Sequence, residues 1–290
     1  MRIKGLNPGE EEISENVDKL CEEYLNAVKG FKSVENARTK YLVSNMARSL
    51  KYVVNRLKLE FSQSDFEPKK CELLIGDGGE IPKIKVDLSD DNQLLLGGII
   101  DRLDTYKGYV RIVDYKSGSR TFRLPDILFG QNMQMLLYLY TVLKSGRYGE
   151  HPAGVLYMGA KRVKDGSPAD RRMNGLLVAD SDIAYAMDKD NKGEFIPKFS
   201  EDKPSNSYLS EDSFSQVFEF IDKKLRDVGE DIFLGKIDAN PIDGIDSPAC
   251  KYCDFLSVCR ISNDKIKKVP KLSNDEVLQK IEKGEEADGN

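Results

Sequence analysis

Apolar residues recur at intervals of three and four positions along the first sixty residues, a spacing typical of helices with one buried face. The pattern predicts one helix over residues 10–29 and a longer helix from about Val34 to Phe61. Pro68 and the serines before it end this helical region. The apolar positions behind the prediction are Ile13, Val17, Leu20, Tyr24 and Leu25 in the first helix, and Leu42, Met46, Leu50, Val53, Leu57 and Phe61 in the second.

Short β-type segments separated by glycines follow this helical region. Helical spacing returns from about Gly130 to Leu143 and again from Asp212 to about Leu234. Strands interspersed with helices predict an α/β fold in which a mixed central sheet is flanked by helices. The predicted strands are Lys70–Ile75, Ile84–Leu88, Leu94–Thr105, Tyr109–Lys116, Ala153–Ala160 and Gly175–Val178.

The order of these elements divides the chain into three expected regions. Residues 1–62 form an N-terminal helical region, and residues 63–262 form the core, which ends in a cysteine-rich loop. Residues 263–290, which finish with EKGEEADGN, are expected to be a disordered tail because the segment is strongly polar.

Composition narrows the class of protein without deciding its function. Of the 290 residues 40% are hydrophobic and 32% are charged, which is typical of a soluble globular protein. No apolar run approaches the roughly 20 residues that a membrane helix needs, and the N-terminus lacks a signal-peptide core, so a cytoplasmic protein without a membrane partner is expected. The formal net charge of −5 weakly opposes nucleic-acid binding, although a nuclease concentrates carboxylates around its metal and can take its basic channel from a neighbour.

The segment GGIIDRLDTYKGYVRIVDYKSG, residues 97–118, contains two β-type runs that meet at Lys107-Gly108 and are typical of a hairpin. With a two-residue turn, Tyr106 pairs with Tyr109, and Asp101 then lies directly opposite Asp114. Directly opposed residues of an antiparallel pair point to the same side of the sheet. Because a one-residue slip would place the two aspartates on opposite faces, this interpretation depends on the length of the turn.

Two carboxylates that are held together among Ile and Val side chains repel each other unless a cation neutralises them. A divalent ion such as Mg²⁺ takes oxygen ligands and often uses only one or two protein carboxylates. Lys116 shares the face of Asp114, where it could orient or deprotonate a water or offset charge on a phosphate. The alternative is an Asp–Lys salt bridge on a solvent-facing side of an antiparallel sheet.

Three ordered motifs resemble the nuclease domain of the RecB and AddB family, within the PD-(D/E)XK superfamily, and the likeness is greater to the AddB subunit of bacterial helicase–nucleases. The motifs are G-G-I-I-D-R-L-D, V-D-Y-K-S-G and G-Q-N-M-Q-M-L-L-Y. The resemblance implies a restriction-endonuclease-like core with bound Mg²⁺ or Mn²⁺. Its implied site residues are the metal ligands Asp101, Asp114 and the carbonyl of Tyr115, the catalytic Lys116, and the helix-borne pair Gln134 and Tyr138.

The same resemblance implies a metal-dependent DNA nuclease domain of an ATP-dependent helicase–nuclease that acts in double-strand break repair and recombination. Its expected partners are DNA, an AddA-like helicase–nuclease subunit and the remainder of its own longer chain. No G-x-x-x-x-G-K-[ST] sequence occurs, so the motor is expected in a partner. Members of this family carry a metal-binding histidine on a helix well before the first aspartate, whereas the single histidine here, His151, follows the motifs. The chain is therefore expected to begin downstream of that helix, and the alternative function is a catalytically incomplete DNA-binding or assembly module.

Cys250, Cys253 and Cys259 form a C-x2-C-x5-C cluster near the end of the chain. Zinc and an iron–sulfur centre would each need a fourth ligand, and the spacing does not choose between them. The family resemblance implies a [4Fe–4S] cluster whose fourth cysteine precedes this chain, so that the set is incomplete here. Cys21 and Cys71 do not match the motif, and each is expected to be a small buried side chain.

Overall fold

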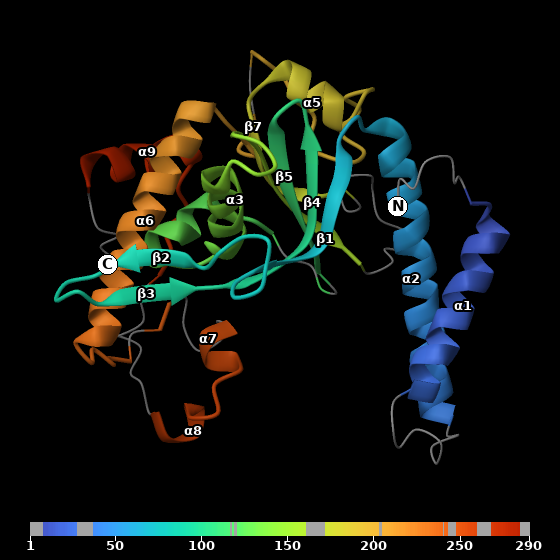
Figure 1. Ribbon diagram of the computed structural model, residues 1–290, viewed down its shortest axis with the longest axis horizontal. Helices are drawn as coiled ribbons and strands as arrows, with labels where there is room; N and C mark the ends of the chain where they lie inside the picture. The colour runs from blue at the N-terminus through green and yellow to red at the C-terminus, as the bar shows by residue number, and fades with distance from the viewer. Residues whose placement is uncertain are drawn as a thin grey trace.

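The computed structural model contains a mixed sheet with helices on both faces, as the sequence predicted (Figure 1). It describes residues 8–27, 37–116, 118, 121–160, 172–202, 205–239, 241–242, 248–259 and 268–284. The strands of the six-stranded sheet lie in the order β1-β4-β5-β6-β7-β8. The β5–β6 and β7–β8 pairs are parallel and the other pairs antiparallel. The bounds are β1 Glu67–Ile75, β4 Gly98–Tyr106, β5 Tyr109–Lys116, β6 His151–Gly159, β7 Asn174–Val178 and β8 Tyr208–Leu209.

The β4–β5 hairpin has the turn that the sequence predicted. Lys107 and Gly108 have φ values of 46° and 85°, and two positive φ values in a two-residue turn match the twist of the flanking strands. Tyr106 pairs with Tyr109, and the ladder continues in this register to the pair of Arg102 and Val113. The assumed turn length is thus confirmed.

The predicted strand Leu94–Thr105 is wrong in one respect, because Gly97 divides it. β3 (Gln93–Leu96) pairs with β2 (Ile84–Asp87) in a separate two-stranded sheet. A β-carbon on Gly97 would lie 2.8 Å from the carbonyl oxygen of Ile75, so only glycine allows the chain to pass this strand closely.

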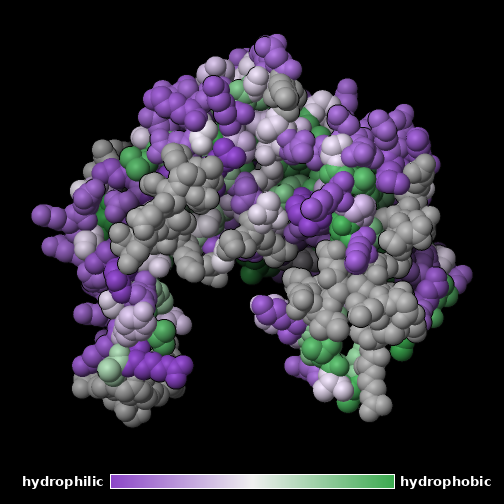
Figure 2. Space-filling view, turned by 180° about the vertical axis from the view of Figure 1, so that it is seen from behind, coloured by the Kyte–Doolittle hydropathy of each residue, from purple (hydrophilic) through white to green (hydrophobic). Residues whose placement is uncertain are grey.

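Helices α1 (Glu10–Ala27) and α2 (Ala37–Gln63) form a hairpin beyond β1. The hairpin and the segment with α7 (Pro248–Lys251) and α8 (Leu256–Cys259) project from the body, and Figure 2 shows a hollow between the two projections. Contacts between α1 and α2 bury a small cluster of Ile13, Val17, Cys21 and Ala47. The helical spacing was predicted correctly, but many of its apolar positions are exposed, among them Leu20, Tyr24, Leu42 and Leu50.

Helices α3 (Gln134–Ser145), α6 (Glu211–Phe233) and α9 (Asn274–Lys283) lie on the side of the sheet opposite α2 (Figure 1). The helix predicted from Gly130 begins later because η2 (Leu124–Phe129), a 3-10 helix, ends at Gly130, where φ is 72°. The helix α6 begins after its N-cap Ser210, close to the predicted position. The buried α3 residues Leu136, Leu139 and Val142 contribute to the main core over the sheet.

In place of the disorder that was expected for the tail, residues 274–283 form α9. Ser273 and Glu276 make a capping box at its start, and the fully buried Val277 joins the main core. A single amphipathic contact therefore orders a polar segment. The sequence also did not indicate α5 (Ser181–Met187). Within the described residues, no helix is both long enough and apolar enough to cross a membrane.

Candidate functional site

The strands β4 and β5 pair from the hairpin turn to Arg102 and Val113 and then part. One further pair in this register would set Asp101 opposite Asp114. At this point the Asp101 carboxylate replaces a backbone acceptor, because its Oδ2 atom accepts a hydrogen bond of 2.8 Å from the backbone N–H of Tyr115. The carboxylate of Asp101 is thereby held beside the segment that carries Asp114 and Lys116.

Asp114 and Lys116 form an ion pair at the same place. Lys116 Nζ lies 2.6 Å from Asp114 Oδ2, and the exposed side-chain fractions are 28% for the lysine and 11% for the aspartate. This contact does not have hydrogen-bond geometry, and the buried Oδ2 atom has no hydrogen-bond partner in the described part of the chain. A buried carboxylate oxygen without a donor is uncommon, and a cation is one way to satisfy it.

The faces of β5 can be assigned from its contacts. The hydroxyl of Tyr115 accepts a hydrogen bond from Arg102, whose guanidinium also contacts Glu60 of α2, so Tyr115 points to the α2 face. Because side chains alternate along a strand, Asp114 and Lys116 point to the opposite face, where α3 lies (Figure 1). Lys116 Nζ also lies 5.8 Å from the ring centroid of Tyr157 on β6.

The helix α3 brings Gln134 and Tyr138 to the strand that carries Asp101. Gln134 Nε2 donates a hydrogen bond of 3.0 Å to the Tyr138 hydroxyl, across one helical turn. A β-carbon on Gly98 would lie 2.8 Å from Tyr138 Cε1, so the tyrosine ring stands directly against this backbone. Gly98 is three residues before Asp101, and the second glycine of the G-G-I-I-D motif thus makes room for the tyrosine.

The backbone of Tyr115 has the direction that a metal-ligating carbonyl would need. The N–H and C=O groups of one strand residue point toward the same neighbouring strand. The Tyr115 N–H points toward β4 and Asp101, whereas the carbonyl oxygen of Lys116 accepts a hydrogen bond of 2.8 Å from Ala160, just after β6. The carbonyl of Tyr115 is therefore directed into the space where β4 and β5 no longer pair.

The residues at the split can be tested against what a divalent ion requires. No group of three or more His, Cys, Asp or Glu side chains suited to a metal occurs in the described ranges. Mg²⁺ does not need such a group, because it commonly binds one or two carboxylates and completes its shell with water and substrate phosphate. Asp101, the unsatisfied Asp114 oxygen and one backbone carbonyl fit this requirement. His151 lies at the start of β6, beside Tyr109 and away from Lys116, and forms an ion pair of 2.6 Å with Glu211.

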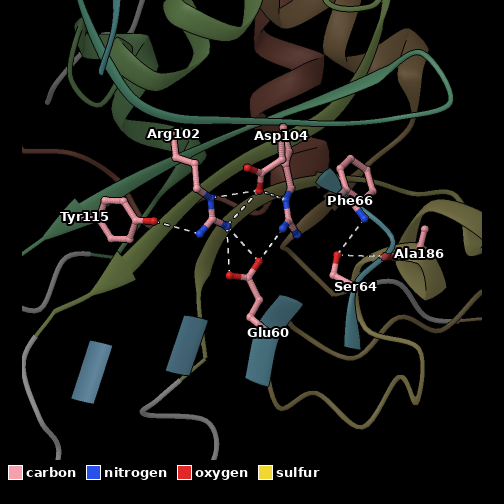
Figure 3. A network of polar contacts seen from close by, with 8 residues as sticks. Glu60, Ser64, Phe66, Arg102, Asp104, Tyr115 and Ala186 are labelled. Atoms are coloured by element: carbon pink, nitrogen blue, oxygen red, sulfur yellow. Dashed lines mark hydrogen bonds and ion pairs between the residues drawn. The ribbon is translucent and has the colours of Figure 1, made fainter. Parts of the chain in front are cut away.

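The sequence did not reveal a buried charge network on the α2 face (Figure 3). It consists of Glu60 on α2, Arg102 and Asp104 on β4, and Arg111 on β5, and each side chain is at most 2% exposed. Burial lowers the pKa of Arg102, but the carboxylates of Asp104 and Glu60 outweigh it and leave the pKa raised. The D-R-x-D pattern contained two members of the network, but no local signal identified their partners.

The cysteines of the C-x2-C-x5-C motif lie in the projecting segment. Cys250 is the third residue of α7 and Cys259 ends α8, while the N–H of Cys253 donates to the carbonyl of Cys250 at 3.1 Å. Cys21 is buried between α1 and α2, as expected. The expectation that Cys71 is buried is wrong, because it lies exposed on β1 at the edge of the sheet. The described residues do not bring a fourth cysteine to form a metal-binding group.

Comparison with known proteins agrees with this geometry. The sequence matches the model of the PD-(D/E)XK nuclease superfamily over residues 3–260. It is also similar to proteins named as the type-B subunit of an ATP-dependent helicase/deoxyribonuclease. The identity is 27% for that of Alkaliphilus metalliredigens and 29% for that of Alkaliphilus oremlandii, each over 94% of this chain, and 31% for that of Acetivibrio thermocellus over 85%. The aligned regions amount to 26%, 26% and 24% of these relatives, so the chain spans about a quarter of their length.

Proposed function

The chain belongs to the PD-(D/E)XK nuclease superfamily, and we propose that it is a metal-dependent DNA nuclease domain that hydrolyses phosphodiester bonds with an activated water. The observation that carries the proposal is the junction at the end of the β4–β5 ladder. There the Asp101 carboxylate bonds to the backbone of Tyr115, and the flanking residues Asp114 and Lys116 form a partly buried ion pair.

Asp101, Asp114 and the carbonyl of Tyr115 would hold Mg²⁺ or Mn²⁺. When bound, such an ion would lower the pKa of a coordinated water and offset negative charge on the phosphate. Lys116 is 28% exposed and remains within 2.6 Å of Asp114. Its ammonium group can therefore turn toward a phosphate oxygen or a water at the mouth of the site without leaving its carboxylate partner.

Gln134 and Tyr138 would orient the DNA rather than bind the ion. The hydroxyl of Tyr138 accepts from the Gln134 amide, and the ring is fixed against Gly98. This leaves the exposed amide of Gln134 at the α3 end nearest β4. An amide in a fixed orientation can donate to a phosphate oxygen, which would place the scissile bond relative to Asp101.

The names of the relatives extend the proposal to a larger assembly. A helicase/deoxyribonuclease that depends on ATP combines the two activities in its name. We infer that this chain acts on DNA in the cytoplasm, in double-strand break repair and recombination, together with an AddA-like subunit and further parts of its own protein. The absence of a P-loop sequence from the 290 residues supports a motor located elsewhere.

Cys250, Cys253 and Cys259 would contribute three ligands to a [4Fe–4S] cluster in the intact protein, with a fourth cysteine from outside this chain. The spacing and the exposed position of Cys253 and Cys259 support this assignment. Four thiolates are needed for such a cluster. The chain by itself would therefore hold iron poorly.

A second candidate function is a DNA-binding or assembly module that does not cut. One observation favours it. His151, which is the only histidine of the sequence, contacts Glu211 at the opposite end of β5 from Lys116. If family chemistry requires a histidine ligand at the metal, this chain lacks it.

Incubation of the chain with labelled single-stranded and double-stranded DNA tests the two candidates. Cleavage should require Mg²⁺ or Mn²⁺, cease with a chelator and be lost in Lys116→Ala. Lys107→Ala is the matched control, because Lys107 is an exposed lysine in the hairpin turn that precedes the same strand. Binding of DNA without cleavage by the unmodified chain would favour the second candidate, and cleavage by Lys116→Ala at the normal rate would contradict the first.

A further inference from the structure

The four charged side chains of the buried network balance one another and connect three elements. Arg102 Nη2 donates to Glu60 at 3.0 and 3.1 Å, and Arg102 Nε donates to Asp104 Oδ2 at 3.1 Å. Arg111 Nε donates to the same Asp104 oxygen at 2.8 Å, and Arg111 also donates to Glu60. Two cations and two anions thus tie α2 to both strands of the hairpin.

Stability alone does not account for this arrangement. Removing four charges from water is costly, and apolar residues of similar volume are often as good or better in such positions. Within the described structure, Asp104 Oδ1 and Arg111 Nη1 are buried without a hydrogen-bond partner, which adds to the cost. What apolar side chains could not supply is the direction of the contacts that Arg102 makes.

One contact of Arg102 leads from the network to the candidate site. Arg102 Nη1 donates to the Tyr115 hydroxyl at 3.0 Å, and its guanidinium lies 5.8 Å from the centroid of the Tyr115 ring. Tyr115 is the residue between Asp114 and Lys116, and it lies beyond the last pair of the β4–β5 ladder. Its backbone bonds to Asp101 and its hydroxyl to Arg102, so two consecutive residues of β4 grip one residue of β5.

We propose that Arg102 and Tyr115 are positioning residues through which the buried network sets the distance between the two aspartates of the metal site. The inference rests on the proposed function. Glu60 and Asp104 hold the guanidinium of Arg102 at three points, and Arg102 fixes the side chain of Tyr115. The backbone of Tyr115 then cannot move away from Asp101 without breaking a buried hydrogen bond to a charged group.

The protonation states agree with the direction of this contact. Burial raises the pKa of Tyr115, and the positive charge of Arg102 offsets only part of that effect. The hydroxyl of Tyr115 therefore remains neutral near pH 7 and accepts from Arg102. The contact persists over the pH range in which a nuclease site with ionised aspartates would work.

Tyr115→Phe tests the proposal, because it removes one hydroxyl and leaves every charge of the network in place. Tyr208→Phe is the matched control. Its hydroxyl is also buried, and it donates to the carbonyl of Pro197 at the far edge of the sheet, on β8. Mn²⁺ binding is measured by electron paramagnetic resonance or calorimetry, together with thermal unfolding and amide hydrogen exchange at residue 115.

The proposal expects Tyr115→Phe to weaken Mn²⁺ binding about fivefold, which is the loss of one hydrogen bond to a charged group in part of the binding equilibrium. Exchange of the residue 115 amide should accelerate, while Tyr208→Phe leaves both quantities unchanged at a similar melting temperature. Unchanged Mn²⁺ affinity and unchanged exchange in Tyr115→Phe, with binding abolished in Asp114→Asn, would overturn the positioning role and leave the proposed metal site intact. If Asp114→Asn binds Mn²⁺ as well as the unmodified chain, the metal site itself is wrong, and the positioning role falls with it.

Discussion

The backbone N–H of Tyr115 donates a hydrogen bond of 2.8 Å to Oδ2 of Asp101, and this bond joins two strands at the point where their ladder has ended. Asp101 therefore serves the fold as well as the proposed chemistry. Its carboxylate completes the hydrogen bonding of β5 and, at the same position, faces the segment with Asp114 and Lys116. The two roles can be separated by substitution.

Asp101→Asn should remove metal binding and cleavage while it largely preserves the fold, because the amide oxygen can still accept from Tyr115. Asp101→Leu should lose the same functions and also about 1–3 kcal/mol of the free energy of unfolding, because it leaves the half-buried N–H without an acceptor. Urea denaturation of both variants measures the difference. Equal stability of the two variants would show that the hydrogen bond does not support the strand.

Glu60→Gln should be one of the most destabilising single changes in the chain. It leaves the guanidinium groups of Arg102 and Arg111 with one carboxylate, in a site that is at most 2% exposed. Breaking a buried ion network from one side costs roughly 3–5 kcal/mol. Glu67→Gln, which alters an exposed ion pair with Lys69 on β1, is the matched control and should have a far smaller effect. A small effect of Glu60→Gln in chemical denaturation would mean that water reaches the network.

Gly98→Ala should displace Tyr138 and loosen the contact between α3 and β4. The new methyl group would lie 2.8 Å from two ring atoms of Tyr138, and overpacking of this kind costs about 1–3 kcal/mol. Gly159→Ala is the control, because a β-carbon there meets nothing within 4 Å. In a double-mutant cycle, Tyr138→Ala should relieve the cost of Gly98→Ala. Additive losses in that cycle would contradict direct contact between the two residues.

The cysteine motif leads to a prediction about iron. After anaerobic purification, this chain should contain well under one [4Fe–4S] cluster per molecule, and Cys253→Ala should change its iron and sulfide content little. The physical reason is that three thiolates leave the cluster one ligand short and open to loss. A stoichiometric cluster that survives in air would show that Cys21, Cys71 or another ligand completes the set.

Local chemistry explains why the hairpin was predictable from the sequence. Lys107-Gly108 sets the turn, and each residue of β5 then has one partner and one face, so Asp101, Asp114 and Lys116 could be placed together. The α/β class followed from the alternation of helical and β-type spacing. These inferences needed no information beyond about twenty consecutive residues.

The charge network depends on contacts between distant parts of the chain, and these left no local pattern. Glu60 is 42 residues from Arg102 and 51 from Arg111, and its place in α2 resembles that of any charged helical residue. The same limit applies to α9, where one buried valine and a capping box order a segment whose composition indicates disorder. Exposure on the α1–α2 hairpin was also missed, because periodicity predicts a helix but does not show what covers its apolar face.

The central claim is that Asp101 and Asp114 share one divalent ion. Anomalous diffraction from a crystal of the chain soaked with Mn²⁺ would test it most directly. The account predicts one peak in the split between β4 and β5, at roughly 2.0–2.6 Å from an oxygen of each aspartate and from the carbonyl of Tyr115. Aspartate carboxylates separated by more than about 8 Å, or a manganese peak that contacts neither of them, would contradict the claim.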